Sequence, residues 1–190
     1  MSRLVFALLA WVMLGLETGL KDLFTLGRTG VSPSFVVVLA VFVAMHAPAS
    51  FAVWGGLILG VALDLTASID LEQGYAPAFV LGPHALGLAL GVQAVLTLRG
   101  IMMRRNPLSL VFLSVVACGA MEVVVVASHT LRWAYGDPIA WSPTGELLAR
   151  LGSAIYTGAA GLVLALLLFP LASLCGFPQQ GSAWRARRAF

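Results

Sequence analysis

Long apolar runs alternate with short polar segments along the chain, and each run predicts a helix. Residues 4–16 are apolar, and extension through residues 17–20 gives a first helix of roughly 25 Å. No A-x-A cleavage site follows this run, so an uncleaved membrane-spanning helix explains it better than a signal peptide does.

The next apolar stretch, residues 31–66, is too long for one helix. It would measure roughly 54 Å, whereas the hydrocarbon core of a bilayer is ~30 Å thick. Pro48 is the natural break, because proline interrupts the backbone hydrogen bonds of a helix. We therefore predict helices over residues 31–47 and 49–66, and we expect Ser32 and Pro33 to be the N-cap and first residue of the former.

Three further helices follow. The fourth lies within residues 77–98 and starts properly near Pro83, and the fifth starts after Asn106-Pro107 and covers residues 108–127, with room to continue through His129. Ser142-Pro143 opens the sixth, which continues from residue 147 to about residue 174 with a kink at Pro170.

Composition places these helices in a membrane. Hydrophobic residues make up 60% of the 190-residue chain and charged residues only 10%, and the mean hydropathy is +0.97. A soluble domain carries roughly 25% charged residues and cannot bury so much apolar surface. The predicted fold class is therefore all-α, a polytopic membrane protein with six transmembrane helices in one domain, residues 1–176.

A basic and aromatic tail, residues 177–190, follows the predicted domain. Its arginines alternate with aromatic residues, a pattern suited to a membrane interface rich in anionic lipid. The predicted interface residues are Trp184, Arg185, Arg187 and Arg188. The pI of about 9.3 is explained in the same way, because the bases flank apolar runs, so nucleic acid is not an expected partner.

The distribution of basic residues predicts the orientation. With six crossings, seven bases fall on the side of the two termini: Arg3, Arg99, Arg104, Arg105, Arg185, Arg187 and Arg188. Four fall on the other side: Lys21, Arg28, Arg132 and Arg150. The positive-inside rule then makes both termini cytoplasmic. Most acidic residues, Glu17 and Glu146 among them, are expected at the outer boundary.

Two acidic residues, Asp64 and Glu122, remain inside predicted spans. Both lie about 14 residues from the cytoplasmic start of their helices, so they are at matched depth, roughly 21 Å in. His84 enters from the outer side and His129 lies two turns beyond Glu122, so Asp64, His84, Glu122 and His129 can form an outer polar cluster. One interpretation is a binding site or relay, since ionisable groups inside a membrane are functional candidates. The other is that both acids reach outer water or a neighbouring helix end, because the pattern predicts no further charged partner at that depth.

Glycines line one face of the third predicted helix. Gly55 and Gly56 precede Gly60, and the spacing of four residues between Gly56 and Gly60 lets another helix pack closely. Gly87 and Gly91 repeat the spacing. The interpretations are helix packing within the subunit, which is common in membrane bundles, and a partner-binding surface.

The sequence does not match the residue spacings of the membrane enzymes considered. The G-x-x-x-D-x-x-x-D run of membrane phosphatidyltransferases matches at Gly60 and Asp64, but the next acid, Asp70, lies on a different helical face. Ser153 lacks the turn of a serine nucleophile. Cys118 and Cys175 fall at different depths, so neither a disulfide nor a cysteine metal site is expected. The sequence predicts no enzyme, no metal and no cofactor.

Two short segments resemble a known family. Residues 55–65 read GGLILGVALDL and residues 81–86 read LGPHAL, which is similar to the G-x-x-x-G-x-x-x-D-L and later L-G-x-x-A-L signature of the MreD family of rod shape-determining proteins. Pro33, the chain length and the six-span layout fit as well. The likeness covers residues 31–130, and the chain departs from the family in longer loops at residues 67–80 and 133–146 and in its arginine-rich tail.

The resemblance implies a non-enzymatic component of the bacterial cell-elongation machinery in the inner membrane. Such a protein would bind MreC and act with MreB, RodA and a class-B penicillin-binding protein in lateral peptidoglycan synthesis. The family is thought to share its architecture with vitamin-binding subunits of energy-coupling-factor transporters, so a small-molecule-binding transporter subunit is the alternative. The docking patch of those subunits on the first helix, A-x-x-x-A, is missing, because Ala7 and Ala10 are three residues apart.

Overall fold

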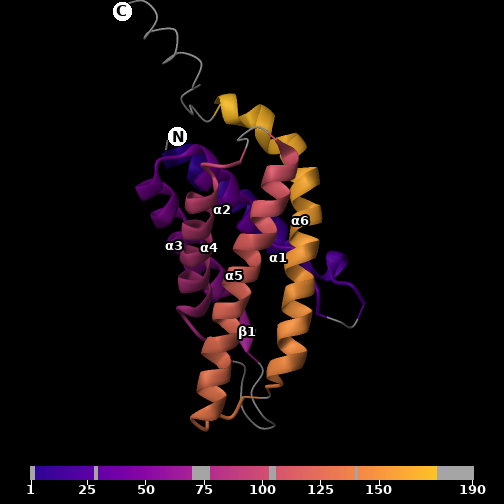
Figure 1. Cartoon of the computed structure of the whole chain (residues 1–190). Helices are drawn as coiled ribbons and strands as arrows, with labels where there is room; N and C mark the ends of the chain where they lie inside the picture. The colour runs from indigo at the N-terminus through magenta and orange to yellow at the C-terminus, as the bar shows by residue number, and fades with distance from the viewer. Residues whose placement is uncertain (1–2, 28–29, 70–77, 103–105, 140, 175–190) are drawn as a thin grey trace, which may run out of the picture.

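The computed structural model is an all-helical bundle of six helices with one short strand pair (Figure 1). It describes residues 3–27, 30–69, 78–102, 106–139 and 141–174. The elements in chain order are α1 (Arg3–Phe24), α2 (Phe35–His46), α3 (Ala49–Thr66), β1 (Ser68–Ile69), β2 (Ala78–Phe79), α4 (Pro83–Leu98), α5 (Pro107–Ala134) and α6 (Pro143–Leu174).

Four helices, α1, α3, α5 and α6, are long and apolar enough to cross a membrane, which identifies a membrane protein. The other two are shorter, since α2 has 12 residues and α4 has 16. Many large apolar side chains point away from the bundle, including Leu4 and Trp11 on α1 and Trp54 on α3. Exposed apolar side chains on α1, α3, α4, α5 and α6 fit contact with lipid.

Helix α2 is the centre of the molecule and contacts each of the other five helices. Every side chain from Val36 to Met45 is buried, because the helix is apolar on all sides. Its 12 residues span only about 18 Å, much less than the long helices around it. The N-terminus of α2 therefore ends inside the bundle, level with Cys118 on α5 and Thr157 on α6.

The start of α2 differs from the expected one. The N-cap is Ser34, whose hydroxyl accepts a hydrogen bond from the Val37 amide at 3.3 Å, so the prediction of Ser32 and Pro33 was wrong. Tertiary contacts explain the difference, because the backbone amide of Ser32 donates to Ser153 Oγ on α6 at 3.2 Å. The segment before Ser34 is thereby held in a non-helical conformation.

Other predicted boundaries agree more closely. The predicted limits of α3 are confirmed, α4 begins at Pro83, and Asn106 caps α5 by accepting from the Leu108 amide at 2.9 Å. Helix α5 continues beyond His129 to Ala134, because no glycine or proline lies between His129 and the positive-φ Gly136.

The ends of the elements show how the chain is arranged. The start of α1 and the last turns of α6 lie at one end of the bundle, whereas β1 lies toward the opposite end (Figure 1). The loop expected after α3 contains an antiparallel pair, β1 with β2, that sequence analysis did not predict. Pro170 lies inside α6, whose final turns bend over the end of the bundle. The predicted tail, residues 177–190, lies outside the described residues.

Candidate functional site

Asp64 joins the end of α3 to the start of α4. Its carboxylate accepts hydrogen bonds from the backbone amides of Gly82 at 2.8 Å, His84 at 2.9 Å and Ala85 at 3.2 Å, and it lies 2.8 Å from Nδ1 of His84. The residue at the N-cap position of α4 is Gly82, which has no side chain to cap the helix. Asp64 therefore caps α4 from a neighbouring helix, and the positive end of the α4 dipole stabilises its charge.

The glycines of α3 and α4 are used for packing within this chain. A Cβ atom on Gly60 would lie 2.7 Å from the carbonyl oxygen of His84, and one on Gly56 would lie 2.9 Å from Val92 Cγ2. Gly87 and Gly91 face the backbone of α5 in the same way, and Gly55 faces the ring of Phe6 on α1. The structure thus accounts for these glycines as helix packing; no partner chain is needed to explain them.

Glu122 has a charged partner that sequence analysis did not anticipate. Arg150 on α6 donates to its Oε2 atom at 2.7 Å and also contacts Glu146 at 3.3 Å. The expectation that no further charged group lies at this depth was therefore wrong. Arg150 was assigned to the outer boundary, although the spacing of four between Glu146 and Arg150 is a usual signal for an ion pair along a helix.

The predicted outer polar cluster divides into separate groups. Asp64 pairs with His84, and Glu122 pairs with Arg150. The ring of His129 is buried and packs edge-on against Trp141, with 5.2 Å between ring centroids. Its Nδ1 atom has no hydrogen-bond partner among the described residues. Of the four predicted residues, only His84 and Glu122 line a common cavity.

This cavity, called here the Glu122 cavity, has a volume of about 320 Å³ and lies between α1, α3, α4, α5, α6 and the N-terminus of α2. Its size lies within the usual range of small-molecule sites, about 300–1,000 Å³. Its floor contains the buried residues Pro33, Ser34, Leu63, Cys118, Met121, Glu122 and Thr157. Its rim includes the exposed residues Thr18, Lys21, Gly30, Thr66 and Ser68, so the cavity opens to the outside of the protein.

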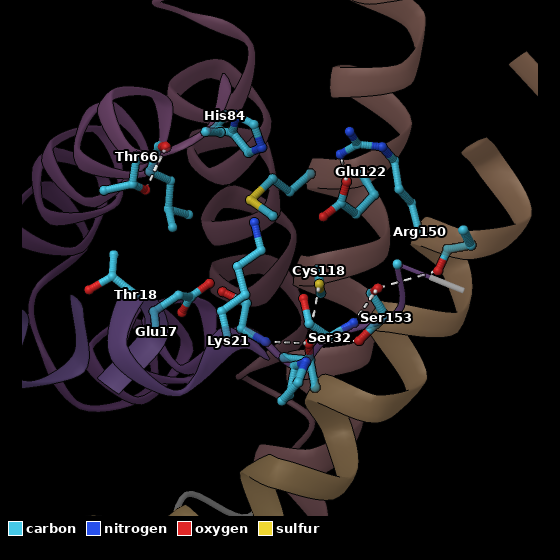
Figure 2. A pocket seen from close by; sticks show the side chains of 18 of the residues that line it. Glu17, Thr18, Lys21, Ser32, Thr66, His84, Cys118, Glu122, Arg150 and Ser153 are labelled. Carbon is cyan, nitrogen blue, oxygen red and sulfur yellow. Dashed lines mark hydrogen bonds and ion pairs between the residues drawn. The ribbon is translucent and has the colours of Figure 1, made fainter. Parts of the chain in front are cut away.

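Charged side chains face one another across the Glu122 cavity. Glu17 and Lys21 on α1 lie opposite Glu122 and Arg150 on α5 and α6 (Figure 2). Glu17, expected at the outer boundary, instead caps α2, because its Oε2 atom accepts from the Val36 amide at 2.9 Å. A carboxylate at a helix N-terminus is stabilised by the helix dipole.

Hydrogen bonds that involve hydroxyl groups join the floor of the cavity to α6. The Ser34 amide donates to Thr157 Oγ1 at 2.9 Å, and the Thr157 hydroxyl donates to the Ser153 carbonyl at 2.7 Å. These contacts close the gap that the short α2 leaves between the long helices. Sequence analysis did not select Ser34 and Thr157 as site residues, because single hydroxyl residues in apolar runs are common.

The described residues contain no group of three or more His, Cys, Asp or Glu side chains arranged to hold a metal ion. Cys118 is free and buried. The predicted lipid-interface residues Trp184, Arg185, Arg187 and Arg188 lie outside the described residues, as does Cys175. Comparison of the chain with protein-family models, curated proteins and solved structures finds no match.

Proposed function

We propose that the chain is a non-enzymatic scaffold of the MreD type in the bacterial inner membrane. In this proposal it binds MreC and works with MreB, RodA and a class-B penicillin-binding protein to support lateral peptidoglycan synthesis and rod shape. In this proposal the chain crosses the membrane six times, the short α2 doing so together with the non-helical residues before it, and both termini are cytoplasmic. Anionic lipid binds the basic tail.

One observation carries this proposal. The two segments that resemble the MreD signature are separated by residues 66–80 of the chain, yet they form one structural unit. Gly60 lets the backbone of Ala85 approach α3, and Asp64 accepts hydrogen bonds from Gly82 and His84. The contact between the two halves of the signature supports a common structural origin with the MreD family. A chance match of small and apolar residues would not require the two segments to meet.

The test is recovery of the partner from gently solubilised membranes. A tagged full-length chain should retain MreC, and depletion of the chain should make rod-shaped cells wider or round. A protein that inserts normally but never retains MreC, in cells that keep their shape, would contradict the proposal. The glycines of α3 are poor sites for this test, because their substitution disturbs packing inside the chain.

The Glu122 cavity favours a second candidate, a small-molecule-binding subunit of a transporter. Its volume of about 320 Å³ and its opening beside exposed residues suit such a role. Equilibrium binding of vitamins to the purified chain distinguishes the two candidates. A depleted strain that keeps its shape but requires an external vitamin would favour the transporter subunit.

A further inference from the structure

We propose that the Glu122 cavity binds a small zwitterion, whose ammonium group is held by Glu122 and whose acidic group is held by Lys21. A ligand of this class goes beyond the proposed scaffold function. It would also be the ligand of the transporter subunit, the second candidate function. The proposal itself rests only on the geometry of the cavity.

Glu122 offers an unused acceptor. One carboxylate oxygen, Oε2, is bound by Arg150 at 2.7 Å, whereas the other has no hydrogen-bond partner among the described residues. The Glu122 side chain keeps 11% of its surface exposed and lines the cavity. A carboxylate in this semi-enclosed position attracts a cationic donor more strongly than a carboxylate in water does, because the surroundings are less polar.

Lys21 offers an unused cation on the opposite wall. Its side chain extends from α1 into the cavity (Figure 2). Its ammonium has no hydrogen bond or ion pair within the described part of the chain, and in particular none joins it to Glu122. On the other wall, Glu122 and Glu146 share the single guanidinium of Arg150, so that wall keeps one negative charge in excess opposite the positive charge of Lys21.

The other charged groups of the cavity already have partners. Arg150 contacts both Glu122 and Glu146, and Glu17 caps α2 through the Val36 amide. Hydroxyls on the floor bind the backbone of neighbouring segments. A ligand with only an acid or only an amine would complement the charge of one wall, whereas a zwitterion complements both walls.

Two larger apolar side chains also line the Glu122 cavity. Leu63 on α3 and Met121 on α5 offer contacts for the carbon skeleton of the ligand. The cavity volume of about 320 Å³ lies within the usual range of small-molecule sites, and its largely polar lining suits a charged ligand.

Calorimetry on the purified full chain in lipid nanodiscs tests the proposal. The probes are the common α-amino acids and the ω-amino acids of three to eight carbons, each compared with the acid and the amine that lack the opposite charge. We expect at least one zwitterion to bind at least about tenfold more tightly than both of its singly charged analogues. If every zwitterion binds no better than its analogues, the proposal is wrong.

Variants locate the binding. Lys21→Met should weaken the best zwitterion at least about tenfold, while Lys21→Arg should retain most of the affinity. The Lys21 side chain is exposed and makes no hydrogen bond or ion pair to the described residues, so we expect this change to leave the fold intact. Unchanged affinity in Lys21→Met would overturn the proposal. Glu122→Gln should weaken binding to a similar degree.

A matched control lies outside the cavity. Arg132→Met removes an exposed ion pair with Asp137 and should leave zwitterion affinity unchanged. An equal loss in this control and in Lys21→Met would show that net charge, and not the cavity, governs binding, and would refute the proposal. Recovery of MreC is measured on the same variants, so a chain that keeps MreC but binds no zwitterion rejects the ligand and leaves the scaffold standing.

Discussion

Asp64 and His84 are joined twice, once through the His84 backbone amide at 2.9 Å and once through its ring Nδ1 atom at 2.8 Å, both to Oδ1 of the carboxylate. Only 1% of Asp64 is exposed, so no water can replace these contacts. The carboxylate thus connects α3 to the first turn of α4.

Replacement of Asp64 should weaken this connection. We expect Asp64→Ala to lower the free energy of unfolding by about 2 kcal/mol, the upper range for a lost N-cap, because several buried amides lose their acceptor. Asp64→Asn should cost less, since one carbonyl oxygen still accepts. Thermal unfolding in detergent measures both. Equal stability of Asp64→Ala and the unmodified chain would contradict the capping role.

Glycine substitutions should differ according to what each glycine faces. Gly60→Ala should destabilise strongly, because the new Cβ would meet backbone atoms of α4. Gly56→Ala should cost less, because the nearest atom is a side-chain methyl group of Val92. Gly119 on α5 is the control, as a Cβ there meets nothing within 4 Å. Gly119→Ala should be neutral or stabilising by up to about 1 kcal/mol. The order of the unfolding midpoints tests the close approach of α3 and α4.

Loss of one partner of the Glu122–Arg150 ion pair should lower the free energy of unfolding more than loss of both partners does. Arg150→Met leaves a largely buried carboxylate without its cation, which we expect to cost about 3 kcal/mol. Adding Glu122→Met should restore much of that loss. Arg132→Met is the comparison, because its pair with Asp137 is 41% exposed on both sides and contributes less than about 1 kcal/mol. A double-mutant cycle on thermal unfolding measures the coupling between the two residues of each pair. Additive losses of stability in the Glu122 and Arg150 variants would argue against direct coupling.

Arg99 should stabilise the end of the central helix. Its Nη1 atom donates to the carbonyl oxygens of Ala44 at 2.8 Å and Ala47 at 2.9 Å, where α2 ends. Arg99→Met should cost about 2 kcal/mol and speed amide hydrogen exchange in the last turn of α2. Thr97→Ala is the matched control, because the Thr97 hydroxyl donates to carbonyl oxygens within α4 and to no other element among the described residues. Equal exchange in the two variants would exclude this role of Arg99.

Reporter fusions test the membrane orientation in the proposed function. A reporter after Phe190 should be active only in the cytoplasm, whereas one inserted at residues 70–75 should be active only outside. The expectation follows from the excess of basic residues on the side of the termini. A tail reporter that is active only outside would refute the orientation.

The sequence by itself determined the helical elements, because their signals are local. Pro48 and the apolar run after it defined α3, Pro83 marked the start of α4, and Asn106-Pro107 marked the start of α5. Capping and proline chemistry act within one turn of the chain, so neighbouring residues suffice to recognise them. The low content of charged residues likewise indicated a membrane protein without any knowledge of contacts.

Tertiary structure alone decided which polar groups meet. Ser34, and not Ser32, caps α2 because α6 holds the preceding segment through Ser153. Arg150 reaches Glu122, and Glu17 reaches the start of α2, because the short central helix leaves polar space between longer neighbours. Such contacts depend on the rotation, tilt and depth of each helix relative to the others. Periodicity shows which residues share a face of one helix, but packing between helices decides what that face meets.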